Sequence, residues 1–159
     1  MKALVLDTNV WLDYFLAERP GHADAFRFVD AAVEAEVPLL VASHSMKDFW
    51  YLFWQSNKHA NAREGSMEAE EASQTAKHVS WAVVEHISDL ATVVGSDESD
   101  AWLARKMRST HDDYEDNLVV AAALRAKPDL LVSSDQALIA HCPVAAAPPT
   151  DALGYLDVL

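Results

Sequence analysis

The sequence predicts an α/β domain built on a mainly parallel sheet of about four or five strands. Short apolar runs alternate with longer stretches of helical periodicity along the chain. Proline and glycine, as in Pro20-Gly21 and at Pro128, separate these stretches. A length of 159 residues suits one domain of this class, and we expect it to span residues 1–159.

Each expected element rests on a local pattern. The strands are the apolar runs at residues 3–6, 39–42, 92–94, 130–132 and 144–147. Apolar stripes and capping residues predict helices at about 10–16, 23–36, 43–55, 67–89, 96–107, 117–126 and 136–140, and Thr150 is expected to cap a terminal helix. Residues 58–65 are polar and are expected to connect the third helix to the fourth.

Composition and charge exclude several classes of protein. The single cysteine, Cys142, rules out an intrachain disulfide and indicates a reducing compartment. The N-terminus reaches Asp7 before a signal-peptide core could be completed, and the apolar runs are too short to span a membrane, so we expect a cytoplasmic protein. The net charge of −13 argues against tight, generic nucleic-acid binding, but part of that charge could belong to acids that surround a bound cation.

Four aspartates are placed to meet at one edge of the expected sheet. Asp7 and Asp135 directly follow two strands, and Asp48 lies on the helix that follows a third. Asp116 lies at the start of the helix that leads into the strand before Asp135. Because ligands of open parallel sheets bind at the carboxyl ends of the strands, we expect these carboxylates to converge there.

Converging carboxylates repel one another, and burying them without a partner would raise their pKa values or destabilise the fold. A hard divalent cation removes this conflict, and Mg²⁺ or Mn²⁺ is expected because both prefer oxygen ligands. The sequence contains neither the cysteine pairs nor the His-Glu-x-x-His motif that would indicate zinc. An oxygen-ligated metal beside a phosphodiester can activate water and stabilise the leaving oxygen.

Taken together, these segments resemble the PIN-domain nucleases. Val5-Leu6-Asp7-Thr8-Asn9-Val10 is similar to the opening strand of that family. Asp113-Tyr114-Glu115-Asp116, followed by the small residues Ala121-Ala122-Ala123, resembles its third acidic motif, and Leu131-Val132-Ser133-Ser134-Asp135 its fourth. The resemblance runs from Leu4 to about Leu138.

The resemblance implies a PIN-like three-layer α/β/α fold and a metal-dependent endoribonuclease, like the toxins of VapBC-type toxin–antitoxin pairs. RNA would then be the substrate, and an antitoxin protein is a partner to test for. The metal ligands, direct or through water, would be Asp7, Asp116 and Asp135, with Asn9, Ser133 and Asp113 in supporting positions.

The chain departs from the family pattern at two positions. The second acid of the family is usually a glutamate, whereas this chain offers Asp48 as the fourth acid of the site. Ser133 stands where threonine is commoner, a change that keeps the hydroxyl.

Each acid also has an ordinary structural interpretation. Asp7 and Asp135 could simply cap the helices that follow them. Asp48 and Asp116 could simply be favourable negative charges near a helix N-terminus. The joint placement of the acids at one edge, in the order of the family, favours the metal site.

Two surface features allow two interpretations each. Arg105, Lys106 and Arg108 form a basic cluster that contacts either RNA phosphates or merely the C-terminal end of its own helix. The aromatic run from Phe49 to Trp54 must partly be core, but its extent also indicates contact with a second subunit, so a dimer is expected. Of the histidines, His111 adjoins the acidic loop.

Two other functions compete with a ribonuclease. A catalytically degenerate PIN-like domain would keep the fold for binding or regulation, an alternative supported by the Asp48 departure and the negative charge. A haloacid dehalogenase-like phosphatase would need a second aspartate two residues after Asp7, where Asn9 stands. Metal-dependent cleavage of single-stranded RNA separates the nuclease from the degenerate domain.

Overall fold

A five-stranded parallel sheet forms the centre of the computed structural model, which describes residues 2–63 and 68–156. The strands are β1 (Leu4–Leu6), β2 (Leu39–Ala42), β3 (Ala91–Val94), β4 (Leu130–Val132) and β5 (Ala146–Ala147). Their order across the sheet is β3-β2-β1-β4-β5, and every neighbouring pair is parallel. The predicted sheet is therefore confirmed.

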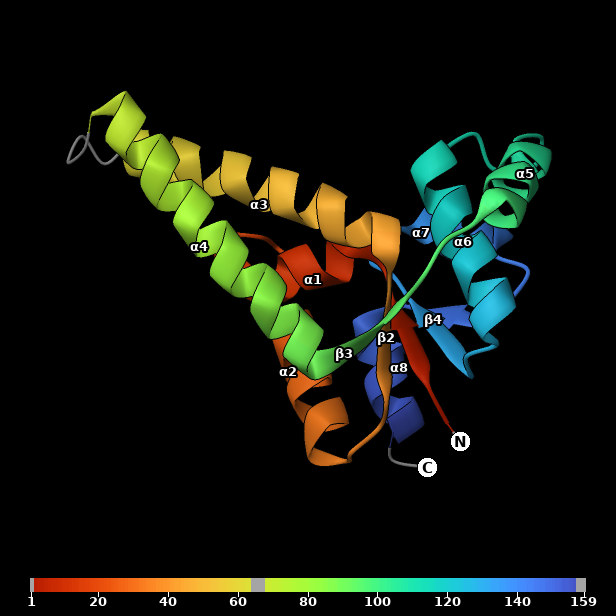
Figure 1. Cartoon of the computed structure of the whole chain (residues 1–159). Helices are drawn as coiled ribbons and strands as arrows, with labels where there is room; N and C mark the ends of the chain where they lie inside the picture. The colour runs from red at the N-terminus through yellow and green to blue at the C-terminus, as the bar shows by residue number, and fades with distance from the viewer. Residues whose placement is uncertain (1, 64–67, 157–159) are drawn as a thin grey trace.

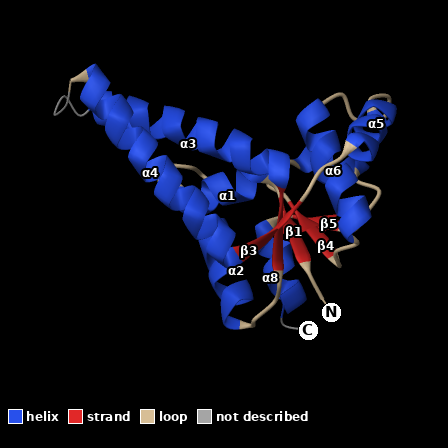
Figure 2. Cartoon of the chain, in the orientation of Figure 1, coloured by secondary structure: helices blue, strands red, loops and turns tan. Residues whose placement is uncertain are grey.

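Helices lie on both sides of this sheet (Figure 1). They are α1 (Thr8–Phe15), α2 (His22–Glu34), α3 (Ser43–Arg63), α4 (Ala69–Leu90), α5 (Glu98–Met107), α6 (Tyr114–Ala126), α7 (Gln136–His141) and α8 (Pro149–Leu156). Figure 2 shows the strands between a group that includes α1, α2 and α8 and a group that includes α5 and α6. The long helices α3 and α4 run side by side and extend away from the sheet as an arm.

The alternation of side chains along each strand separates two cores. Leu4 and Leu6 of β1 belong to the larger core, whereas Val5 between them packs with residues of α6 and α7 on the opposite face. β4 alternates in the same way, with Leu131 in the smaller core. A sheet with a core on each face is the three-layer α/β/α arrangement that the sequence predicted.

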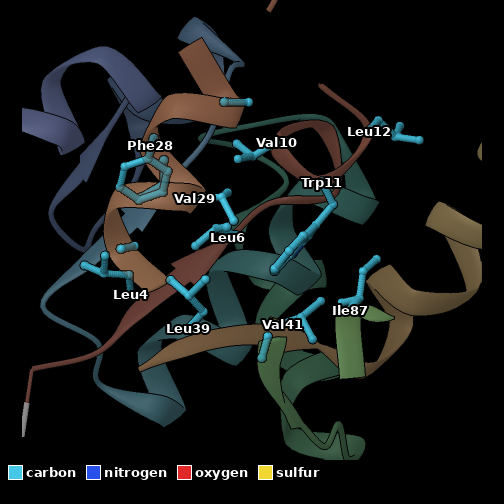
Figure 3. Packing of buried hydrophobic residues seen from close by; sticks show 14 of the residues in the cluster. Leu4, Leu6, Val10, Trp11, Leu12, Phe28, Val29, Leu39, Val41 and Ile87 are labelled. Atoms are coloured by element: carbon cyan, nitrogen blue, oxygen red, sulfur yellow. The ribbon is translucent and has the colours of Figure 1, made fainter. Parts of the chain in front are cut away.

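The larger core packs the helices of the N-terminal part of the chain against the sheet. Trp11 of α1, Phe28 of α2 and Ile87 of α4 are fully buried against the sheet (Figure 3). Phe49 and Phe53 of α3 also lie in this core, 1% and 4% exposed. Two residues of the aromatic run therefore serve packing within the chain, and the expectation of a subunit contact is limited to the others.

Several boundaries differ from the prediction because local capping and packing moved them. Helix α3 continues to Arg63, through most of the stretch expected to be a connection, because α4 packs along it. Residues 64–67, which include the expected start of the fourth helix, lie outside the described part of the chain. Helix α6 begins at Tyr114 rather than Asn117, because the Asp113 side chain accepts hydrogen bonds from the amides of the next turn.

Among the helices that the structure describes, none carries an apolar run of the length that a bilayer crossing requires.

Candidate metal centre

The site lies where the direction of the sheet order reverses. β1 pairs with β2 on one side and with β4 on the other, so the chain adds β2 and β3 on one side of β1 and then crosses to add β4 and β5 on the other. Such a switch point opens a crevice at the carboxyl ends of the strands. The backbone closes tightly there, since Asp7 N donates to Val132 O over 2.9 Å. The residues that follow β1 and β4 are therefore held together.

Asp7 is the most deeply buried acid of the site. Its residue is 2% exposed, and Ser133 Oγ donates to its Oδ2 over 2.8 Å. The same hydroxyl oxygen accepts from the Asp135 amide over 3.0 Å, so Ser133 links the first acid to the last. Burial raises the pKa of Asp7 to about 7, and the negative charges of Asp116 and Glu115 raise it further. A carboxylate in this setting calls for a cationic partner.

Asp116 lies in the first turn of α6, where it is partly buried. His111 Nε2 is 2.8 Å from its Oδ2, and the Asn117 side chain donates to the His111 carbonyl oxygen over 2.8 Å. Burial raises the pKa of Asp116, and the charges of Asp113 and Asp135 add to the rise. Asp113 caps the helix with its Oδ1 and so orients the turn that carries Asp116.

Asp135 both caps a helix and belongs to the acidic group. Its Oδ1 accepts from the amides of Ala137 and Leu138 over 2.7 and 3.1 Å at the start of α7. Its charge at the same time raises the pKa of Asp116. The capping interpretation and the site interpretation are therefore compatible for this residue.

Asp48 lies in the second turn of α3, past the first turn where the helix dipole acts most strongly. The dipole explanation for its position is therefore weakened. Lys47 Nζ is 2.6 Å from its Oδ1, and the side chains are 80% and 19% exposed respectively. The negative charge of Asp48 also acts on the acids of α6, because it raises the pKa of Glu115.

Glu115 is an acid to which the sequence analysis assigned no role. It is half-buried in the first turn of α6, and its pKa is raised by burial first and then by Asp48, Asp113 and Asp116. Its charge also raises the pKa of Asp7. Adjacency to Asp116 at a helix start that faces the sheet edge was the signal in the sequence that could have identified it.

The donor set suits a hard divalent cation, since every candidate ligand is a carboxylate oxygen and the acids destabilise one another's charged forms. Within residues 2–63 and 68–156, however, no three His, Cys, Asp or Glu side chains stand close enough to enclose an ion. Ser133, His111 and Lys47 each engage one carboxylate instead. To share a cation, the carboxylates would have to move closer together, and each keeps a second oxygen outside these contacts.

Asn9 joins a different network from the one that its supporting role suggested. Its Oδ1 accepts from Arg19 Nη2 over 3.4 Å, and Arg19 Nε in turn lies 2.6 Å from Asp13 Oδ1. Ser134 Oγ donates to Asp13 Oδ2 over 2.7 Å. Asp13 is only 3% exposed, so this paired, buried carboxylate ties α1 to the loop that carries Asp135.

The Asp13 network predicts the effect of filling the space beside it. A Cβ built on Gly21 would lie 2.7 Å from Asp13 Cγ, so Gly21→Ala should displace the carboxylate and lower the free energy of unfolding by about 1–3 kcal/mol. Gly154→Ala is the matched control, because its Cβ meets nothing within 4 Å and the residue lies in α8. The control should gain roughly 0.5–1 kcal/mol in a urea titration. Equal effects of the two changes would contradict the importance of the network.

The basic cluster of the sequence lies at the end of α5. Arg108 Nε pairs with Asp112 Oδ1 over 3.2 Å in an exposed ion pair, and Lys106 Nζ lies 5.5 Å from the centre of the Trp102 ring. Arg105 lines a shallow cavity with Arg108, next to Asp112 and Asn117. Arg108 and Lys106 therefore have partners within the chain, and RNA binding by this cluster stays a prediction.

A cluster of acidic side chains lies at the switch point of a parallel sheet with the strand order 3-2-1-4-5. These two features define a class of α/β proteins with carboxylates along one edge of the sheet. The sequence profile described as the PIN domain matches residues 3–137, most of the chain. The chain therefore belongs to the PIN domain family, a family of nucleases. This membership removes the basis for the phosphatase alternative. No curated protein matches the chain by sequence.

Solved structures with the same fold share little sequence with this chain. The VapBC2 structure from Rickettsia felis, bound to a promoter DNA fragment, matches with a TM-score of 0.63 at 10% identity, covering 92% of this chain and 98% of that one. PAE2754 from Pyrobaculum aerophilum matches with a TM-score of 0.62 at 14% identity, covering 99% and 97%. VapC20 from Mycobacterium tuberculosis, a toxin that cleaves the sarcin–ricin loop, matches with a TM-score of 0.59 at 15% identity, covering 86% and 93%.

Proposed function

We propose that this protein is a divalent-metal-dependent endoribonuclease that hydrolyses RNA phosphodiester bonds. The observation that supports this most is Asp7, a buried carboxylate at the switch point whose pKa is raised to about 7 by burial and by the acids of α6. A buried carboxylate destabilises the fold when it is ionised, and groups of this kind are typical of functional sites. VapC20, which has the same fold, is a toxin that cleaves the sarcin–ricin loop.

The proposed ligands of Mg²⁺ or Mn²⁺ are Asp7, Asp116 and Asp135, with Asp48 and Glu115 completing the acidic edge. A bound ion of this kind supplies an activated water and stabilises charge on the leaving oxygen. Ser133 orients Asp7, and the Asp113 cap orients Asp116. The same carboxylates could also hold the ion through bridging water molecules, without direct contact.

Cleavage assays test this function directly. The purified protein should cut single-stranded RNA in Mg²⁺ or Mn²⁺ and should be inactive in excess chelator. Asp116→Asn should reduce the rate by orders of magnitude while circular dichroism shows an unchanged fold, whereas Asp112→Asn, in an exposed ion pair with Arg108, should not. Activity that persists in chelator would contradict the proposal.

Metal should also stabilise the folded chain, because the unfolded chain cannot assemble the acids. At 100 times the dissociation constant the gain in the free energy of unfolding should be about 2.7 kcal/mol. Thermal melts with and without Mn²⁺ measure it. An unshifted midpoint at a concentration that saturates cleavage would count against a metal bound by the folded state.

We further propose that the protein is the cytoplasmic toxin of a toxin–antitoxin pair and that it forms a dimer. Several structures with the same fold are VapBC or FitAB assemblies, which supports an antitoxin partner. Tyr51 and Leu52 of α3, 47% and 41% exposed, suit a subunit contact. Growth arrest on expression, relieved by the product of an adjacent gene, tests the toxin. Sedimentation should show a species heavier than the 17.5 kDa chain.

The degenerate PIN-like domain is the second candidate. It is favoured by the partners that already engage Asp48 and Asp116, namely Lys47 and His111. This alternative predicts that Mn²⁺ neither shifts the melting midpoint nor promotes RNA cleavage. Both measurements therefore separate the two candidates.

A further inference from the structure

A groove beside the acidic edge has no role in the site described above. Met46, Lys47, Trp50, Trp81 and Val84 line it, and its volume is about 380 Å³. It lies between α3 and α4, near the base of the arm that these helices form (Figure 1). Lys47 belongs to both features, since it lines the groove and its Nζ contacts the Asp48 carboxylate. Lys47 thus links the groove to one acid of the candidate site.

Indole rings form a connected surface along this groove. Trp81 of α4 is 60% exposed, and its ring lies 6.0 Å from that of Trp50, at an angle of 56°. Trp50 in turn stacks on Trp54, with ring centres 5.9 Å apart and planes 23° from parallel. Trp54 is anchored, because its Nε1 donates to Ser73 O over 3.3 Å. The exposed ring of Trp81 therefore packs on Trp50, which in turn packs on the hydrogen-bonded ring of Trp54.

Positive charge accompanies these rings, although the chain as a whole carries −13. Lys58 Nζ and Lys77 Nζ lie 5.2 and 5.8 Å from the centre of the Trp54 ring, and neither forms an ion pair with an acid in the described parts of the chain. Over residues 43–61, α3 contains the cations Lys47 and Lys58 and one acid, Asp48. On α4, Lys77 is accompanied by four acids, Glu70, Glu71, Glu85 and Asp89. Lys58 and Lys77 thus place positive charge beside the aromatic rings.

We propose that the groove between Trp50 and Trp81 binds an unpaired base of a single-stranded nucleic acid. Lys47, Lys58 and Lys77 would contact the phosphates of the same strand. Aromatic rings interleaved with cations are the elements by which proteins hold single strands without strong sequence preference. Bases of a duplex are stacked inside and cannot reach an indole ring, so the occupant is single-stranded. The inference rests on the proposed nuclease function and names the form of its substrate.

Binding of a fluorescein-labelled, single-stranded RNA, followed by anisotropy in chelator and again in Ca²⁺, tests this inference apart from cleavage. Trp81→Ala should weaken binding roughly 5- to 150-fold, as loss of one base–aromatic stack does, and Trp81→Phe should restore most of it. Lys77→Gln should weaken binding and reduce the slope of log affinity against log salt by about one. Duplex RNA of the same sequence should compete poorly.

Phe26→Ala is the matched control, because Phe26 is an aromatic residue of α2 that is 46% exposed and belongs neither to the groove nor to the basic cluster of α5. It should bind RNA like the wild type. Because Trp81 is exposed, Trp81→Ala should fold normally, and a thermal melt checks this. In metal, Trp81→Ala should raise KM for RNA and leave kcat nearly unchanged.

The outcomes separate this inference from the proposed function. Binding that depends on Trp81 without metal-dependent cleavage would support the groove and contradict the nuclease. Cleavage with equal RNA affinity and KM in wild type and Trp81→Ala would support the nuclease and overturn the groove. Loss of a sedimenting dimer in Trp81→Ala, with RNA affinity unchanged, would assign this face to a second copy and also overturn it.

Discussion

Replacing Asp7 with asparagine should abolish RNA cleavage and, in metal-free buffer, make the folded protein more stable. The carboxylate is 2% exposed, and burial holds its pKa at about 7 against an ordinary value of 3.8. Between these values the folded chain keeps a proton on Asp7 that the unfolded chain has lost. The free energy of unfolding therefore falls as the pH rises from about 4 to about 7, and the loss is complete above that.

Asp7→Asn removes this pH dependence. Its amide oxygen can still accept from Ser133 Oγ, and no ionisation is left to destabilise the fold. At pH 8 without metal the variant should gain on the order of 2–4 kcal/mol over the wild type, and at pH 4 the difference should nearly vanish. Urea titrations of both proteins at the two pH values measure it.

Asp13→Asn is the matched control, because Asp13 is equally buried but is paired with Arg19 and Ser134. Removing that charge should instead cost about 1–3 kcal/mol, since two donors would lose their charged acceptor. A destabilised Asp7→Asn at pH 8, or one that still cleaves RNA, would mean that Asp7 is a structural residue and not a ligand.

Asp48→Asn should lower the cleavage rate by orders of magnitude with almost no change in stability. The ion pair that it breaks is between Asp48 and Lys47, whose side chain is 80% exposed, and such pairs contribute at most about 1 kcal/mol. What the variant loses is the negative charge that faces Glu115 across the acidic edge. Asp48→Glu, which restores the commoner residue of the family, should keep partial activity if α3 accepts the longer side chain.

Asp112→Asn provides the comparison for Asp48, because it removes an aspartate from an ion pair whose side chains are both more than 80% exposed and lie outside the acidic edge. If Asp48 is only a surface partner of Lys47, both variants should cleave RNA at the wild-type rate and bind Mn²⁺ equally. That result would leave a site of the other acids. Calorimetric titration with Mn²⁺, in parallel with the cleavage assay, distinguishes a ligand from a charge that acts at a distance.

The sequence by itself determined the elements and the order of the acids. Asp7 and Asp135 follow apolar runs too short to be helices, and parallel strands bring their ends to one edge whatever the details of packing. The uninterrupted apolar run Leu4, Val5 and Leu6 indicates a strand that is buried on both faces, with a core on each. These features are local, so one sequence suffices to predict them.

Tertiary structure decided the features that depend on partners distant in the chain. Helix α3 reaches Arg63 because α4 packs beside it, and no capping signal in its polar end announces this. Ser134 meets Asp13 across 121 positions. Glu115 and Asp48 come together only when α6 and α3 reach the same edge. The pKa of Asp7 depends on how many neighbours exclude water from it, and burial is a property of the assembled fold that the spacing of residues does not contain.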